Sequence, residues 1–86
     1  MRQEYEAILA EIFLRHLIKE RRRLGLTQEA MAGLLLMSLR SYANLEHGVN
    51  TCGVITLVTF LINCSESPTA FLQELTLAFS CAYAAV

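Results

Sequence analysis

The first quarter of the chain repeats apolar residues at intervals of three and four. These residues form one stripe, with a flank that widens the apolar face beyond what a single core contact requires. The stripe comprises Tyr5, Ile8, Leu9, Ile12, Phe13 and Leu17, and the flank comprises Ala7, Leu14 and Ile18. The spacing predicts a helix over residues 3–23, and Gly25 suits the left-handed position that ends a helix.

Two shorter apolar patterns follow this stretch. Thr27 and Ser38 are good N-cap residues, and Gly48 is suited to close the second pattern. The patterns predict helices over residues 28–35 and 39–46. The residues expected to point inward are Met31, Ala32, Leu35, Tyr42 and Leu45.

The second half of the chain has two further apolar segments. Residues 53–63 are β-branched enough for a strand, yet the sequence offers no hairpin partner and the spacing also fits a buried helix. Its stripe would be Val54, Leu57, Val58, Leu61 and Ile62. Ser67 as N-cap and Pro68 at the first position predict a last helix over residues 68–83. Its stripe would be Phe71, Leu72, Leu75, Ala78, Phe79 and Ala82.

These patterns predict an all-α fold: one compact five-helix domain over residues 1–86, with an extended N-terminal helix and an apolar C-terminal helix. The hydrophobic share of 55% is high and calls for a dense core, a partner or a membrane. Residues 47–65 carry no Lys, Arg, Asp or Glu, which is about the length of a membrane span. Polar residues interrupt this stretch, however, so we expect a buried helix and no membrane contact.

Charge is unevenly distributed along the chain. The net charge is −1, but residues 1–40 hold all seven Lys and Arg residues. Lys19, Arg21, Arg22 and Arg23 form one basic cluster, at which a polyanion would meet the protein. The same cluster is also favoured at a helix C-terminus by the backbone dipole, and the two interpretations are compatible.

The sequence offers little for catalysis or metal binding. It has no Asp and no Gly-rich phosphate loop, and its two histidines, His16 and His47, lack metal-ligand spacing. We therefore expect no enzyme, no cofactor and no metal. Three widely spaced cysteines, Cys52, Cys64 and Cys81, are expected to be reduced thiols, mostly in the core of a cytoplasmic protein.

Residues 27–48 carry the most specific signal, reading TQEAMAGLLLMSLRSYANLEHG. Leu24-Gly-Leu-Thr-Gln28 opens the segment and Leu45-Glu-His-Gly48 closes it. In these residues the chain resembles the lambda-repressor-like (Cro/cI-type, xenobiotic-response-element) helix-turn-helix regulators. The resemblance implies that the second short helix lies in the major groove of DNA while the first crosses the phosphate backbone.

The resemblance also implies roles for individual residues. Arg40 could clamp guanine and Asn44 adenine, and Leu39 could touch a thymine methyl. The full base-reading set would be Ser38, Leu39, Arg40, Ser41 and Asn44, although these side chains could simply face solvent. Phosphate contacts are expected from Gln28, Thr27, Arg22 and Arg23, with helix capping the alternative for Gln28. Arg21 and Glu46 correspond to a largely buried ion pair of the family, with an exposed pair that contributes little to stability as the alternative.

Two functions follow as expectations. The first is a sequence-specific repressor that binds two-fold symmetric double-stranded DNA as a homodimer, its dimer surface comprising Phe71, Leu75, Phe79, Tyr83, Leu14 and Ile18. The second is a protein-interaction module on the same fold, antitoxin-like or an anti-regulator, which docks a partner through Leu34, Leu36 and Leu39. A neutral loop over residues 49–53, and Leu36 in a turn where the family usually has glycine or a polar residue, favour the second.

Overall fold

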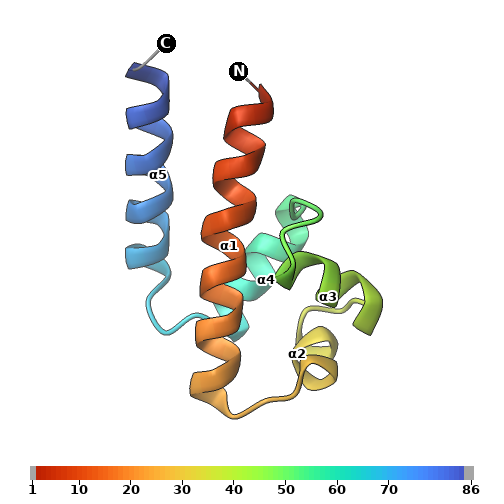
Figure 1. Ribbon diagram of the computed structural model, residues 1–86. Coiled ribbons are helices and arrows are strands. Elements are labelled where there is room, and N and C mark those ends of the chain that lie inside the picture. Colours follow the sequence, from red (N-terminus) through yellow and green to blue (C-terminus); the bar gives the residue numbers. More distant parts are fainter. Residues whose placement is uncertain (1, 85–86) are drawn as a thin grey trace.

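The computed structural model describes residues 2–84 and contains five helices and no strand within that range (Figure 1). The helices are α1 (Arg2–Leu24), α2 (Gln28–Leu34), α3 (Leu39–Glu46), α4 (Val54–Asn63) and α5 (Pro68–Ala84). The predicted all-α class is confirmed, and every described helix boundary lies within one residue of its prediction.

The helix ends are fixed by the residues that the sequence marked as caps. Thr27, Ser38 and Ser67 each accept a hydrogen bond from the backbone N–H three residues ahead, which satisfies one of the unpaired donors of a helix N-terminus. Gly25 and Gly48 have φ of +69° and +70°, the left-handed conformation that terminates α1 and α3. Local chemistry therefore determines where these helices begin and end.

The helices divide into a pair and a cluster. The long helix α1 descends from the N-terminus, and α5 returns antiparallel beside it, so both chain ends lie at the same end of the molecule (Figure 1). The shorter helices α2, α3 and α4 gather beside the C-terminal half of α1. The molecule is consequently elongated, with extents of 39 × 24 × 20 Å.

Three phenylalanines from three helices form the centre of the core. The ring centroid of Phe13 in α1 lies 5.1 Å from that of Phe60 in α4 and 6.2 Å from that of Phe71 in α5. The rings of Phe60 and Phe71 are 5.7 Å apart, and all three side chains are buried. Aromatic groups in such tilted and edge-to-face arrangements stabilise the fold beyond their apolar area alone. This cluster fixes α4 and α5 against α1.

Buried Glu20 holds the connection between α4 and α5. Its carboxylate accepts hydrogen bonds from Arg23 Nε at 2.8 Å and from the backbone N–H of Glu66. Arg23 also donates to the carbonyl oxygen of Cys64 at 3.1 Å. Burial pushes the pKa of Glu20 upward, but these hydrogen bonds and the charge of Arg23 outweigh burial and leave the pKa below its usual value.

The face of α4 that meets the core differs from the prediction. Val54, Val58 and Ile62 were expected to point inward, but all three are exposed, and the helix buries Phe60 instead. Leu72 of α5, also expected inward, is exposed as well. Leu57 and Leu61, the other two residues expected inward, are half-buried against the core, so the predicted face of α4 was right only in part. The polar residues of this segment, Thr56, Thr59 and Asn63, do not mark the face that meets solvent, so the sequence alone did not indicate it.

One residue predicted at a dimer surface, Phe71, belongs to the protein's own interior, so that assignment was wrong. Phe71 is fully buried in the aromatic core. Leu14 packs on the end of α3, since a Cβ added to Gly48 would lie 3.0 Å from Leu14 Cδ2. Ile18 is half-buried one turn further along α1, on the same side as Leu14 and Arg21.

Candidate nucleic-acid interface

The helices α2 and α3 are joined by a tight turn over residues 35–38. Backbone hydrogen bonds from Leu36 N–H to Gly33 and from Met37 N–H to Ala32 form this turn. Leu36 has φ +60°, and its side chain is 81% exposed. A leucine in this backbone conformation is strained by about 1 kcal/mol, and with so little contact to the protein it gains no packing in return.

The reading-helix candidate α3 has two distinct faces. Tyr42, Leu45 and Glu46 are buried against the rest of the protein. The opposite face carries Arg40 and Asn44, which are one turn apart and so project from the same side of the helix. His47, exposed at the C-cap, continues this face by a further turn. The sequence analysis missed His47 as a candidate contact, although its spacing of three from Asn44 pointed to it.

The N-terminus of α3 engages its own serines. The Ser38 hydroxyl accepts from the backbone N–H of Ser41 and donates to the Ser41 hydroxyl at 3.0 Å. Both residues remain exposed, as does Leu39 beside them. The two hydroxyls therefore shape the helix start, and Arg40 and Asn44 are the freer polar groups on α3.

An ion pair between α1 and α3 holds α3 in place, as predicted. Arg21 Nε donates to Glu46 Oε2 at 2.7 Å and Arg21 Nη2 donates to Glu46 Oε1 at 3.2 Å. Arg21 also donates to the carbonyl of Leu26 at 3.3 Å, and Gln28 Nε2 donates to Glu46 Oε1 at 2.9 Å. One buried carboxylate thus joins α1, α2 and α3 (side chain of Glu46 5% exposed).

The charges in this network are stabilised by one another. Burial pushes the pKa of Glu46 upward, but hydrogen bonds from Arg21 and Gln28 more than offset burial, so its pKa lies below the usual value. The adjacent Tyr42 is fully buried, which raises the pKa of its phenol, and the nearby Glu46 carboxylate acts in the same direction. Glu46 is therefore ionised and Tyr42 neutral at neutral pH.

The residues predicted to contact phosphates have different surroundings. Thr27 Oγ1 serves as the cap of α2, and the Gln28 amide is bound to Glu46. Arg23 is held by Glu20 and the Cys64 carbonyl, so its guanidinium is already engaged within the protein and not free for the predicted phosphate contact. Arg22 is exposed and makes no ion pair with any residue of the range 2–84.

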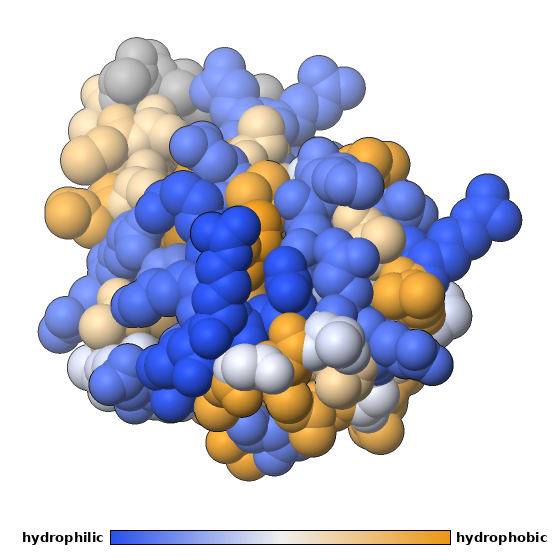
Figure 2. Space-filling model, turned by 60° about the horizontal axis from the view of Figure 1, so that its bottom comes forward, coloured by the Kyte–Doolittle hydropathy of each residue, from blue (hydrophilic) through white to orange (hydrophobic). Residues whose placement is uncertain are grey.

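Few positive charges remain available on this surface. Four of the seven basic side chains, Arg2, Arg15, Arg21 and Arg23, are in ion pairs with carboxylates. Within the described part of the chain, Lys19, Arg22 and Arg40 have no such partner. Figure 2 shows this end of the molecule, where hydrophilic side chains cover much of the surface and apolar patches lie along its lower edge and at its sides.

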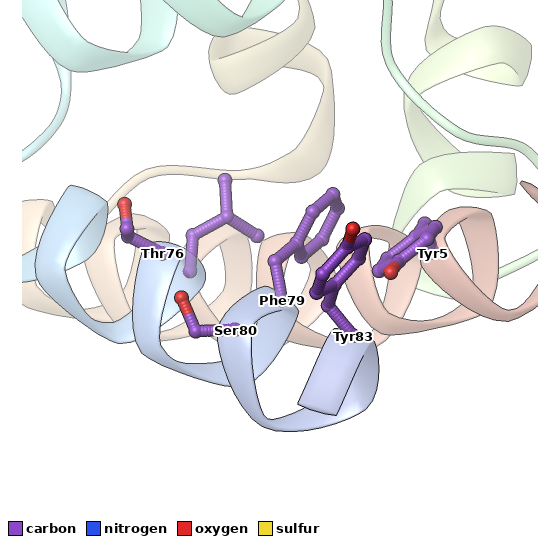
Figure 3. Close-up of a pocket in the computed structure, with 6 residues that line it drawn as sticks. Tyr5, Thr76, Phe79, Ser80 and Tyr83 are labelled. Carbon is purple, nitrogen blue, oxygen red and sulfur yellow. The ribbon is translucent and has the colours of Figure 1, made fainter. Parts of the chain in front are cut away.

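The other predicted dimer residues lie away from α3, along α5. Leu75, Phe79 and Tyr83 line a shallow groove together with Tyr5 of α1 (Figure 3). The rings of Tyr5 and Phe79 lie 4.9 Å apart, so Phe79 is half-covered by its own chain. Tyr83 is exposed, and the hydroxyls of Thr76 and Ser80 interrupt the apolar lining. This groove is mixed in character rather than uniformly apolar.

Histidine and cysteine side chains are dispersed. His16 packs edge-on against Phe71, with its Nε2 2.8 Å from Glu74 Oε1, so it is engaged between α1 and α5. Cys64 is buried and Cys52 half-buried, where burial raises the pKa of the Cys52 thiol to about 11. Cys81 is exposed, so two of the three cysteines lie in or against the core, as expected, and the third does not. No group of three potential metal ligands occurs among residues 2–84.

Comparisons of the chain with protein-family models, with curated proteins and with solved structures give no match. No helix within residues 2–84 has the length and apolar character needed to cross a membrane.

Proposed function

We propose that this chain is a sequence-specific DNA-binding regulator of the lambda-repressor-like class, with α3 as the helix that enters the major groove. The observation that carries the proposal is the outward face of α3. Arg40 and Asn44 project from this face one turn apart, and neither side chain forms an ion pair or a side-chain hydrogen bond within residues 2–84. Arginine and asparagine are the residues best matched to guanine and adenine edges, respectively.

The support beneath α3 strengthens the proposal. A base-reading helix has to be held rigidly, because a hydrogen bond to a base edge depends on position to a few tenths of an ångström. The bidentate contact of Arg21 with Glu46, together with Gln28, connects the inner side of α3 to α1 and α2. Buried Tyr42 and Leu45 pack the same side of the helix.

The electrostatics suit modest binding by one copy and stronger binding by two. DNA affinity rises with the number of phosphates that basic side chains neutralise. Because Arg40 is assigned to a base, one copy offers only Lys19 and Arg22 for this purpose, which is few. Two copies on a two-fold symmetric site would double this number, so we propose a homodimer. A dimer lying across the groove would exclude other proteins from that stretch of DNA, which is the action of a repressor.

Selection from fragmented genomic DNA, including the fragment upstream of the chain's own coding sequence, tests this function. We expect a few fragments to be enriched at about 50 mM salt and to weaken strongly at about 200 mM. Arg40→Ala and Asn44→Ala should abolish the preference while leaving the fold intact, because both side chains lie on the outer face of α3. Equal recovery of all fragments by all three proteins would contradict the proposal.

A second candidate function rests on Leu36. Its left-handed backbone and its exposed apolar side chain both destabilise the folded state. Leu34 and Leu39, close to it in the sequence, are exposed as well. These three leucines would suit a protein partner that docks over the turn, as in an antitoxin-like module or an anti-regulator. Tight binding to one protein together with unselective DNA binding would favour this candidate.

A further inference from the structure

One exposed arc of α4 is apolar, and the exposed Asn63 lies outside it. Val54, Ile55 and Ile62 are 74–81% exposed and Val58 is 46% exposed. At 100° per residue, these four side chains span about 100° of the helix surface, opposite the buried Phe60. We call this set, Val54, Ile55, Val58 and Ile62, the α4 stripe. The solvent-facing arc of a surface helix normally carries charged or polar residues. An exposed apolar arc is instead typical of a surface that another molecule covers.

The chemistry around the α4 stripe restricts what can cover it. Residues 47–65 contain no Lys, Arg, Asp or Glu. A phosphate backbone or an anionic membrane would find no positive charge there. A charged protein surface would lose its water without gaining an opposite charge, which is unfavourable. The fitting occupant is therefore another charge-free aliphatic surface.

We propose that the α4 stripe is the surface through which a second copy of this chain docks, α4 against α4. The same face on a second copy is charge-free and aliphatic, so the two faces match without like-charge repulsion. A two-fold axis through such a contact closes the assembly at two copies. Valine and isoleucine also lose little side-chain freedom on burial, because they are already restricted at χ1.

The rival surface on α5 fits a second copy less well. Leu72 and Leu77 are exposed there, but Gln73, Thr76 and Ser80 lie among them. Leu75 and Phe79 are half-covered by their own chain. The α4 stripe has no polar residue within its exposed arc, which is why the dimer is assigned to α4.

The size of the contact sets its expected strength. α4 has ten residues, or about 15 Å of helix, so a helix pair of this length belongs with the small, transient interfaces. The free dimer should therefore be weak and should be strengthened on DNA, where two half-sites hold the copies together. This proposal names the surface behind the two-copy binding proposed above, and the oligomeric state can be measured without DNA.

Charge substitution on the α4 stripe tests the proposal by sedimentation equilibrium, from about 1 µM to about 1 mM protein. One variant carries Ile55→Lys with Ile62→Lys, and another carries Ile55→Glu with Ile62→Glu. The native chain should dimerise, and each variant alone should dissociate with a constant raised at least about 100-fold, because like charges then face each other. An equimolar mixture of the two variants should regain the dimer.

The matched control introduces the same charges on α5, as Leu72→Lys with Leu77→Lys. This control should dimerise like the native chain, and circular dichroism should show the native helix content in all three variants, since the changed side chains are exposed. A monomeric native chain throughout the range would overturn the proposal. Undiminished dimerisation of the α4 variants, or loss of the dimer only in the α5 control, would overturn it as well. Failure of DNA selection beside an intact α4 dimer would count against the proposed function alone.

Discussion

Arg21 and Glu46, 25 residues apart in the chain, meet through two parallel hydrogen bonds of 2.7 and 3.2 Å. Their contact joins the last turn of α1 to the last turn of α3, and α3 carries Arg40 and Asn44 on its opposite side. The orientation of the proposed reading helix therefore depends on a contact made on its inner side, away from the proposed site of DNA.

The first prediction concerns this pair. Glu46→Ala leaves the Arg21 guanidinium partly buried without its partner, so the free energy of unfolding should fall by about 3–5 kcal/mol. Glu46→Gln keeps the shape and one acceptor oxygen and should cost less. The joint replacement of Arg21 and Glu46 by methionine should recover most of the loss, because no unpaired charge remains. Urea denaturation gives the free energies, and a loss below about 1 kcal/mol for Glu46→Ala would show that water compensates the pair.

The second prediction concerns acid. The carboxyls of Glu20, Glu46 and Glu74 have pKa values below the ordinary 4.5 in the folded protein. A lowered pKa means that the unfolded chain binds protons more readily than the folded one. Its stabilisation is therefore fully present above pH 4.5 and is lost as the pH falls through the folded values. Urea midpoints measured at successive pH values below about 5 should fall steeply.

Glu20→Gln and Glu46→Gln provide the controls for the acid effect. Each variant has one fewer carboxyl to protonate, so its stability should depend less steeply on pH in the acid range than that of the native chain. If the variants keep the full acid dependence, the loss of stability arises from general charge repulsion rather than from these two groups.

The third prediction concerns the strained turn. Glycine tolerates the φ of +60° at position 36 without steric cost, and the Leu36 side chain makes little contact with the protein. Leu36→Gly should therefore leave the free energy of unfolding unchanged or raise it by up to about 1 kcal/mol. Thermal unfolding measures the change. A clear loss of stability would mean that the Leu36 side chain does contact the protein in solution. Its strained backbone would then be explained by packing rather than by a function.

The fourth prediction concerns salt. The association constant for DNA falls as the salt concentration rises, with an exponent of about 0.9 for each phosphate that the protein neutralises. Two basic side chains in one copy, Lys19 and Arg22, would lose about 12-fold in affinity between about 50 and about 200 mM salt, and four in two copies would lose about 150-fold. Binding isotherms on a selected fragment therefore report how many copies bind. Arg22→Ala should reduce the slope, whereas Arg23→Ala should not, since Arg23 is held by Glu20.

The sequence predicts those features of this fold that local chemistry determines. Thr27, Ser38 and Ser67 cap helices as expected, and Gly25 and Gly48 end them, because each acts within one turn of its own position. The Arg21–Glu46 pair was predicted from the resemblance of the segment rather than from local rules. Its geometry is confirmed, and the reading role of Arg40 and Asn44 remains a prediction.

The features that the sequence did not predict depend on contacts between distant segments. The face of α4 is decided by Phe60 meeting Phe13 and Phe71, and the polar residues within residues 54–63 do not mark the exposed face. Glu20 lies in a run of basic residues that reads as a solvated helix end. Its burial arises from a backbone N–H 46 residues away, at Glu66. Which face of α4 is buried, and whether Glu20 is buried, therefore depend on how the helices assemble.

The most direct test of the central claim pairs Arg40 with one atom of one base. On a selected fragment, guanines are replaced one at a time by deazaguanine, which lacks the N7 acceptor that a bidentate arginine uses. For the native chain, one guanine in each half-site should lose about 1–3 kcal/mol of binding free energy on replacement. The Arg40→Ala protein should lose nothing more at that position. An equal loss for both proteins, or no sensitive guanine for the native chain, would contradict the account of α3 as the helix that reads DNA.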